Sequence, residues 1–562
     1  MHVHARLLGA ALVALALGCS GETGAESNDA SSGASSDTDD TGLATDATQG
    51  GSADGSGPSG TGGASDTDGD DSAGGDETGD PEDEPLEPST RFDRARQWSV
   101  PSGGWVDQGF VRTGGTVSDP GDDDWTTIDL TGDGVPDLVV TGHWDGDAFE
   151  VFGHGSDPHW NVHPGGTEGF AAQATAWAVP EGGWMEQGFV RAAGTVSDPG
   201  DDDWTTIDLT GDGILDLVVT GRWDGEAFEV PGHGSAPHWD VYEGGENGFA
   251  TTATAWAVPN GGWANQGFVR TAGTVSDPGD DDWTTMDLTG DGVPDLVVTG
   301  HWDGENFEVF GHGATPHWEV YEGGATGFAE SPTQWPVPSG GWVNQGFVRV
   351  GGTVSDPGDD DWTTTDLTGD GRPDLVVTGH WDGDAFEVLG HGATPHWDVY
   401  EGGGRGFSDT PIAWAVPDGG WIDQGFVRIG GTVSDPGDDD WTTTDLNGDG
   451  YPDLVVTGRW DGEAFDVFGF GESPYWNVYT GSADGFALEA ASWPVPEGGW
   501  TGQGFVRMFG TVSDPGDDDW TTTDLNGDGY PDLVVTGHWD GDAFEVLGYG
   551  DAPHWRAFFG TP

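Results

Sequence analysis

From residue 91 onward, the chain repeats one unit six times with a period of 79 residues. Each unit contains the motif Asp-Leu-Thr/Asn-Gly-Asp-Gly, which opens at Asp129, Asp208, Asp287, Asp366, Asp445 and Asp524. Tryptophan follows the same period, because the 30 tryptophans of the chain fall five to a unit. A repeat this regular restricts the fold to architectures in which similar units pack against their neighbours in an array or a ring.

The repeated unit has the pattern of short strands separated by turns. In the first unit, residues 125–130, 137–141, 148–152 and 159–162 are alternating or β-branched, and clusters of Gly, Pro and Asp separate them. No helical periodicity of useful length is present. Four short strands per unit predict an all-β fold in which each unit is one blade of a β-propeller.

The two ends of the repeat region predict that the ring is closed. The last unit stops at Trp555-Arg-Ala-Phe-Phe-Gly, before the Gly-Phe…Trp-x-Val-Pro segment of the other units, and that segment stands near the start as Phe92…Trp98-Ser-Val-Pro101. Pairing of the N- and C-terminal segments would hide the sheet edges. We therefore expect a closed, monomeric ring of six blades. An open array, or a ring in which each unit forms two smaller blades, is the alternative.

The first 90 residues have the composition of an export signal and a tether. Residues 1–18 contain Arg6 and an apolar run too short to span a bilayer, and Cys19 follows them. This resembles a bacterial lipoprotein signal with Cys19 lipidated; ordinary cleavage after Gly18 is the alternative. Residues 19–90 are Ser/Gly/Thr/Asp-rich, acidic and without basic residues, which predicts a disordered tether. We expect residues 91–562 to be displayed at the cell surface or outer membrane, or to be secreted.

The charge of the chain restricts its partners. It has 101 acidic and 15 basic residues, a formal net charge of −86. Nucleic acids and anionic membrane surfaces are excluded, because binding either requires basic residues. Membrane contact is expected only through a lipid anchor at Cys19. The single cysteine also excludes an intramolecular disulfide and a cysteine-based zinc site.

The conserved motif of each unit has the pattern of a cation-binding loop. In the first unit, Asp129, Thr131, Asp133 and Asp137 place side-chain oxygens at positions 1, 3, 5 and 9, and Val135 offers its carbonyl at position 7. Calcium takes six to eight such oxygens and tolerates irregular geometry better than magnesium. The loop is not an EF-hand, because position 12 is not glutamate and no helix follows. The alternative is six acidic Asx turns that bind nothing.

The same five positions recur in every unit, so we expect about six calcium ions, one per repeat. They are Asp208, Thr210, Asp212, Ile214 and Asp216; Asp287, Thr289, Asp291, Val293 and Asp295; Asp366, Thr368, Asp370, Arg372 and Asp374; Asp445, Asn447, Asp449, Tyr451 and Asp453; and Asp524, Asn526, Asp528, Tyr530 and Asp532. Threonine at position 3 of four units is a weaker ligand than asparagine in the last two. Affinities of about 10⁻⁴–10⁻³ M, as in extracellular modules, are expected there.

The loop, together with the Trp-x-Val-Tyr-x-Gly-Gly…Gly-Phe segment, resembles the FG-GAP/VCBS repeats of integrin-type β-propellers and related bacterial surface proteins. The resemblance covers about 470 residues. It implies that the loop binds calcium at a hairpin of each blade and that the protein is an adhesion or ligand-binding module. The 79-residue period is longer than is usual for that family.

Three further features recur. The Asp122–Asp124 run of the first unit is interpreted as turn-forming carboxylates paired with the arginine of Gly-Phe-Val-Arg112, with a second cation site as the alternative. The histidines of Gly-His-Gly-x-x-Pro-His-Trp do not form a zinc site, because Phe470 and Tyr475 replace them in unit five; packing, or a platform for a sugar ring, is expected. The tryptophans are expected to be mostly core, with Trp105 the best candidate for an exposed ring.

No nucleophile motif or phosphate-binding loop is present, and carboxylate pairs are not diagnostic in so acidic a chain. We expect an exported, calcium-binding propeller that binds a glycan or protein ligand, and not an enzyme. The alternatives are a polysaccharide lyase or hydrolase and a passive acidic surface protein.

Overall fold

The computed structural model describes a large part of the repeat region. The described residues are 91–105, 109, 121–146, 148–185, 187–188, 199–263, 267, 279–304, 307–342, 345–346, 358–383, 386–422, 424–425, 436–462, 464–504, 516–539, 544–548 and 552–561. The expected signal segment, Cys19, the tether and the Gly-Phe-Val-Arg arginines lie outside these residues.

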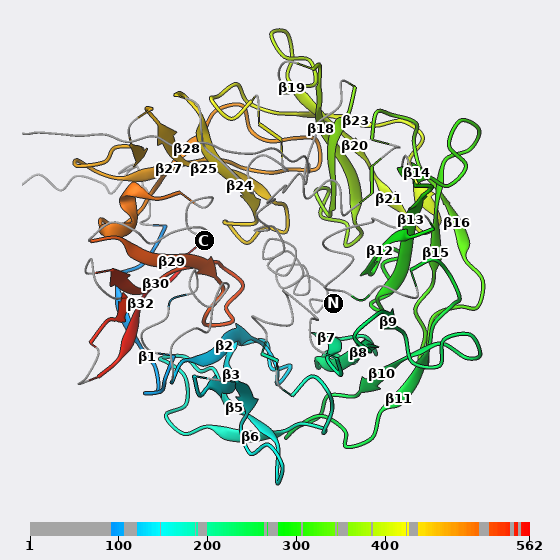
Figure 1. Ribbon diagram of the computed structural model, residues 1–562. Helices are drawn as coiled ribbons and strands as arrows, with labels where there is room; N and C mark the ends of the chain where they lie inside the picture. Colours follow the sequence, from blue (N-terminus) through cyan, green and yellow to red (C-terminus); the bar gives the residue numbers. More distant parts are fainter. Residues whose placement is uncertain are drawn as a thin grey trace, which may run out of the picture. The chain divides into compact units, whose positions relative to one another are not determined.

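Six antiparallel sheets, here called blades 1 to 6, form a closed ring (Figure 1). Blade 1 contains β2 (Asp123–Ile128), β3 (Asp137–Trp144), β4 (Phe149–Val151), β5 (His159–His163) and β6 (Thr175–Ala178). Blade 2 contains β7 (Asp202–Ile207), β8 (Asp216–Trp223), β9 (Phe228–Glu229), β10 (His238–Tyr242) and β11 (Thr254–Ala257). Blade 3 contains β12 (Asp281–Met286), β13 (Asp295–Trp302), β14 (Phe307–Val309), β15 (His317–Tyr321) and β16 (Thr333–Pro336).

The remaining blades follow the same order. Blade 4 contains β17 (Asp360–Thr365), β18 (Asp374–Trp381), β19 (Phe386–Val388), β20 (His396–Tyr400) and β23 (Ile412–Ala415), with a small hairpin of β21 (Gly402–Gly403) and β22 (Gly406–Phe407). Blade 5 contains β24 (Asp439–Thr444), β25 (Asp453–Trp460), β26 (Phe465–Val467), β27 (Tyr475–Tyr479) and β28 (Ala491–Pro494). Blade 6 contains β29 (Asp518–Thr523), β30 (Asp532–Trp539), β31 (Phe544–Val546), β32 (His554–Phe558) and β1 (Arg96–Ser99).

Each blade has five strands, one more than the sequence pattern predicted. In blade 1 the sheet order is β2-β3-β5-β6, and the short β4 pairs with β3 beyond the point where β5 leaves it. The outer strand, β6, lies outside the four predicted strands, because it is short and has only one buried side chain, Trp177. Its equivalent in blade 6 is β1, part of the segment that was predicted to close the ring. Figure 1 shows the β2-type strands on the inside of the ring. The loops that join them to the β3-type strands therefore lie near its centre.

The ring closes through the two ends of the repeat region, as predicted. β1 pairs with β32 in antiparallel register from Arg96↔Ala557 to Ser99↔His554. A bridge from Ser99 to Gly169 then joins this last blade to blade 1. Because each 79-residue period yields one sheet and no edge is left between the ends, the open array and the two-blades-per-unit alternatives are both wrong.

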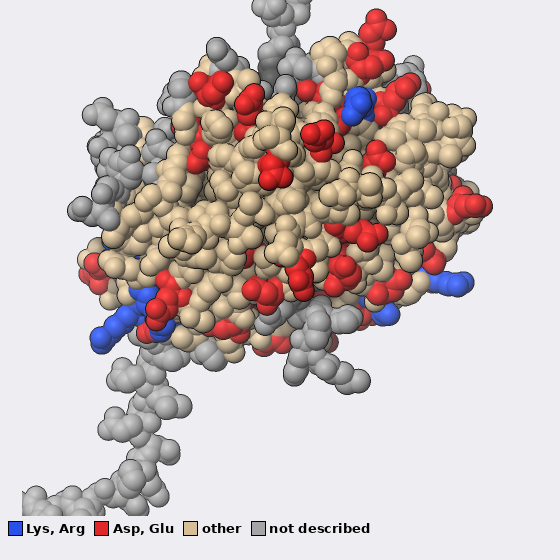
Figure 2. Space-filling model, turned by 90° about the horizontal axis from the view of Figure 1, so that it is seen from below, with Lys and Arg blue, Asp and Glu red and all other residues tan. Residues whose placement is uncertain are grey.

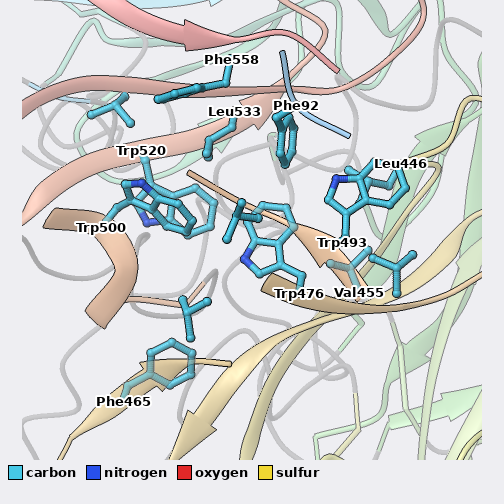
Figure 3. Close-up of a cluster of buried hydrophobic side chains, with 14 residues drawn as sticks. Phe92, Leu446, Val455, Phe465, Trp476, Trp493, Trp500, Trp520, Leu533 and Phe558 are labelled. Atoms are coloured by element: carbon cyan, nitrogen blue, oxygen red, sulfur yellow. The ribbon is translucent and has the colours of Figure 1, made fainter. Parts of the chain in front are cut away.

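The hydrophobic core lies between neighbouring blades, in six clusters of similar composition. Figure 3 shows the cluster between blades 5 and 6, where Trp476, Trp500 and Trp520 pack together. Phe92 of the N-terminal segment packs against Trp476 and Trp493. Such rings fill the space between two twisted sheets and bury large apolar areas. The prediction that Trp105 is exposed is wrong: it is 1% exposed and lies against Trp125 and Trp555.

The outside of the ring carries the excess of acidic residues. Figure 2 shows Asp and Glu side chains scattered over the whole visible face, with few arginines among them. In the parts of the chain that are described, the one helix is a single 3₁₀ turn at Gly499–Gly502, so none there is long enough to cross a membrane.

Candidate functional site

The acidic loop of each blade joins its innermost strand to the next strand and is held by hydrogen bonds within the loop. In blade 1, the amides of Asp133 and Gly134 donate to the Asp129 carboxylate (3.0 and 2.8 Å). The Val135 amide donates to the Asp133 carboxylate at 3.0 Å. The same three bonds recur in the other five loops. The loop backbone is therefore shaped by its own aspartates.

The last aspartate of each loop is buried at the start of the next strand. Asp137 is fully buried and accepts hydrogen bonds from the amides of Leu130 (3.2 Å) and Thr131 (3.1 Å) with one oxygen, and from that of Gly165 (3.0 Å) with the other. Asp137, at the end of the loop, is thus hydrogen-bonded both to the start of the loop and to the segment that follows β5 of the same blade.

The loop carboxylates are close enough to disfavour one another's charge. Burial, together with the smaller effect of the neighbouring charges of Asp129 and Asp133, raises the pKa of Asp137 to about 6 despite its amide hydrogen bonds, which lower it. The corresponding pKa values are about 6 for Asp216, Asp295 and Asp374, about 7 for Asp453 and about 8 for Asp532, with burial the largest cause in each. An added cation would relieve this repulsion.

Position 3 of the loop behaves differently in the threonine and asparagine blades. The hydroxyls of Thr131, Thr210 and Thr289 are buried and have no hydrogen-bond partner among the described residues. In blade 5, by contrast, Asn447 accepts from the amide of Asp449 (2.9 Å) and donates to the Asp453 carboxylate (3.1 Å). An unsatisfied buried hydroxyl is costly, so the threonine loops have a free oxygen that a cation could use.

Replacing Thr131 with asparagine is expected to stabilise the metal-free protein by about 0.5–1.5 kcal/mol, because the amide can make the hydrogen bonds that Asn447 makes. Chemical denaturation of the chelator-treated protein measures this change. The reverse substitution, Asn447→Thr, is the matched control and should destabilise by a similar amount. Equal stability of all three proteins would contradict this interpretation.

The side chains at the loop positions are of the types that bind calcium, but in this structure they do not converge on one point. Three carboxylates and a hydroxyl or amide oxygen stand in every loop, and these are hard oxygen ligands. Within the described ranges, however, no three acidic or histidine side chains converge at the spacing of metal ligands. A bound ion would therefore have to draw Asp129, Asp133 and Asp137 together. The donor set fits calcium on its chemistry and on the orphaned threonine hydroxyls.

The six loops touch one another in a continuous ring, which the sequence did not predict. A Cβ atom added at Gly132 of blade 1 would lie 2.5 Å from the carbonyl oxygen of Gly213 in the loop of blade 2. Equivalent close approaches join every loop to the next, and the last returns from Gly527 of blade 6 to Gly134 of blade 1. In blade 4, Arg372 also donates to the carbonyl of Thr289 in blade 3 at 3.3 Å. A change in the conformation of one loop should therefore displace the neighbouring loop.

Substitution of Gly132 by alanine tests this contact between loops. Gly132 has a φ of 72° and faces the next loop, whereas Gly155 has a φ of 81° and nothing within 4 Å of an added Cβ. Gly155→Ala is expected to cost only the left-handed strain, about 1–2 kcal/mol. Gly132→Ala should cost more, because a neighbouring backbone must also move. Thermal unfolding of the two variants measures the difference, and equal losses would refute the contact.

The acidic run before each inner strand has structural partners. In blade 1, the amide of Gly104 donates to Asp123 at 2.7 Å, and the hydroxyl of Thr141 donates to the fully buried Asp124 at 2.5 Å. Two arginines of the Gly-Arg-Trp segment pair with this run: Arg222 with Asp202 and Arg459 with Asp439. The pairing expected with the Gly-Phe-Val-Arg arginines involves residues outside the described ranges, and a second cation site at Asp122–Asp124 stays a hypothesis.

The recurrent histidines make local contacts with the backbone of the turns in which they stand. The Nδ1 atom of His159 lies 2.8 Å from the Asp157 carbonyl, and His238 and His317 make the same local contact at 2.9 Å. The ring at this position also packs against a preceding phenylalanine, His159 against Phe152 in blade 1 and Tyr475 against Phe468 in blade 5, so tyrosine keeps the packing.

Comparisons with known proteins find only distant structural similarities. No protein-family model matches it, and no curated protein does. A Tc holotoxin pore from Photorhabdus luminescens is similar over 83% of this chain and 15% of its own length, at 14% identity and a TM-score of 0.41. An Agrocybe aegerita lectin that recognises non-reducing terminal N-acetylglucosamine is 16% identical over 77% of this chain and 79% of its own, with a TM-score of 0.39.

A third similar structure is the exotype rhamnogalacturonan lyase YesX, at 13% identity and a TM-score of 0.28, over 83% of this chain and 76% of the lyase. The chain therefore spans a small part of the toxin and about three quarters of the other two. At this level of similarity, none of the three indicates a ligand or an activity for this protein.

Proposed function

We propose that the protein is a calcium-binding β-propeller of the FG-GAP/VCBS kind, exported and anchored through Cys19, that binds a glycan or protein ligand at the cell surface. The observation that carries the proposal is the closed ring of six acidic loops, each touching the next. Buried carboxylates with raised pKa values support a cation in each loop, and the orphaned hydroxyls of Thr131, Thr210 and Thr289 add support in blades 1 to 3.

Calcium would supply positive charge where each loop gathers three carboxylates. Asp129, Asp133 and Asp137, with Thr131, would hold it in blade 1, and their equivalents would do so in the other blades. The loop amides orient the carboxylates by hydrogen bonding. The close contacts at the loop glycines make the position of each loop depend on that of its neighbour. The expected result is a stiff disc that presents fixed surfaces to a ligand.

A binding screen against glycans and extracellular proteins, run with calcium and again with excess chelator, tests this function. Retention of at least one ligand in calcium and its loss on chelation is the expected result. A variant with Asp137, Asp216 and Asp295 changed to asparagine should lose part of the calcium effect. If nothing is retained in either condition, the proposed binding function is wrong. Lipidation is tested separately, by mass analysis of the N-terminal peptide with Cys19→Ala as the control.

A further inference from the structure

Blade 2 has an open cavity of about 500 Å³ on its surface. This volume lies in the usual range of small-molecule sites, about 300–1,000 Å³. Its wall includes Arg222, Glu229, Pro231, Asp240 and Tyr242.

Two residues that break the repeat open this cavity. Where blade 2 has Arg222 and Pro231, blade 1 has His143 and Phe152, whose rings stack with their centroids 5.6 Å apart. The corresponding pair in blade 3, His301 and Phe310, stacks at the same distance. A stacked histidine and phenylalanine thus fill, in those blades, the place that is empty in blade 2.

Proline also shortens the neighbouring strand. In blade 4, the amide of Leu389 donates to the carbonyl of Thr378, but Pro231 has no N–H to make the equivalent bond. Strand β9 accordingly ends at Glu229, whereas the equivalent strand of blade 1, β4, continues for one more residue, to Val151. Proline at this position therefore leaves the end of β9 without the bond that Leu389 makes in blade 4.

Arg222 is held at the edge of the cavity by an ion pair that does not use all of its N–H donors. Its Nε and one terminal nitrogen donate to the two oxygens of Asp202 (2.6 and 3.2 Å), and the Asp202 side chain is only 4% exposed. The guanidinium side chain itself is 62% exposed. Of its five N–H groups, this pairing uses two, so three are left to face a ligand. A planar group held in this way loses little freedom on binding.

The other charged groups of the cavity are carboxylates, which accept hydrogen bonds. Glu181, Asp224, Glu229 and Asp240 line the cavity together with Asp202, so five carboxylates stand against one guanidinium, a formal charge of −4 with His233 neutral. This net negative charge repels an anionic ligand. A ligand with several hydroxyl groups can accept from Arg222 and donate to the carboxylates at once, with the half-buried Tyr242 ring beside it.

We propose that the blade 2 cavity is a binding site for one neutral sugar ring at the end of a glycan. This rests on the proposed binding function and adds to it the place and the chemical class of the ligand. Arg222 is the main donor of the site, and Pro231 is the residue that keeps it open.

Saturation-transfer NMR on the full-length protein in calcium tests the site, with methyl α-D-glucopyranoside, methyl α-D-mannopyranoside and methyl β-D-galactopyranoside as probes and methyl glucuronide as the anionic comparison. At least one neutral glycoside should bind, and the glucuronide should not. Pro231→Phe, which restores the residue of blades 1, 3 and 5, and Arg222→Gln should each weaken binding by about tenfold or more. Arg459→Gln is the matched control: it removes the same ion pair in blade 5 and should change binding less than twofold.

The outcomes separate this inference from the proposed function. Glycans retained in the screen by wild type and Pro231→Phe alike would leave the binding function in place and overturn the blade 2 site. The site would equally be overturned if no neutral glycoside binds, or if the glucuronide binds as well as the neutral probes. Thermal unfolding of Pro231→Phe establishes that it is folded, and Arg222→Gln provides the independent test if it is not.

Discussion

Adding 10 mM calcium to the metal-free protein at pH 8 is expected to raise its melting temperature by about 8–16 °C. With dissociation constants of about 10⁻⁴–10⁻³ M, each occupied loop contributes about 1.4–2.7 kcal/mol at this concentration. Six loops together contribute about 8–16 kcal/mol. A folded region of about 470 residues has an unfolding entropy near 1 kcal/mol per kelvin, which converts that energy into the temperature shift.

The calcium effect should shrink as the pH falls. In the metal-free fold, the pKa values of Asp137, Asp453 and Asp532 are raised to about 6, 7 and 8, whereas an unfolded aspartate has a pKa near 3.9. A raised pKa in the folded state gives stability that is present in full below about pH 4 and is lost as the pH rises through 6 to 8. The metal-free protein should therefore become less stable between pH 4.5 and 8. Calcium binds the deprotonated loops and should restore that loss.

Differential scanning calorimetry at pH 4.5, 6 and 8, with calcium and with chelator, measures both trends. Magnesium at the same concentration is the control, since it prefers a stricter octahedron and should stabilise far less. An unchanged melting temperature on chelation at pH 8 would count against calcium in these loops. A metal-free protein whose stability increases with pH would contradict the carboxylate repulsion itself.

Removing the segment that closes the ring is expected to lower the free energy of unfolding by about 6–10 kcal/mol. A chain beginning at residue 101 lacks Phe92 and Trp98, both buried, and the four-residue pairing of β1 with β32. Loss of each large aromatic side chain costs about 3–5 kcal/mol. Phe92 packs edge-on against Trp476, and Trp98 packs against Phe170 and Phe559, so blades on both sides of the closure lose cover.

A chain beginning at residue 91 is the control for this truncation, because it lacks the tether and keeps β1. We expect its melting temperature to match that of the longer chain, while the chain beginning at residue 101 melts about 6–10 °C lower. Size-exclusion chromatography should also show self-association of the shorter chain, since the exposed edge of β32 can pair with another molecule. Equal melting of the two truncated chains would show that the ring does not depend on its closure.

Much of the fold follows from the sequence because the information is local and repeated. The 79-residue period, the strand patterns and the split last unit predicted six blades and their closure, and the structure confirms both. The outer strand escaped prediction because Thr175–Ala178 is short and buries one side chain. Trp105 was misplaced because its flanking glycines are typical of an exposed turn, whereas only the neighbouring blade decides that its ring is covered.

The sequence by itself determined which oxygen-bearing side chains stand in the acidic loops, since they lie within nine residues of one another. Only the tertiary structure decided that these loops touch around the ring, because Gly132 and Gly213 are brought together by the packing of two sheets. It also decided that blade 2 is open. Arg222 and Pro231 look like minor variations in a repeat, and their effect depends on the stacked rings that fill the same place in blades 1 and 3. The cavity is formed by residues that are far apart in the sequence, and local sequence patterns do not show which space the neighbouring side chains leave unfilled.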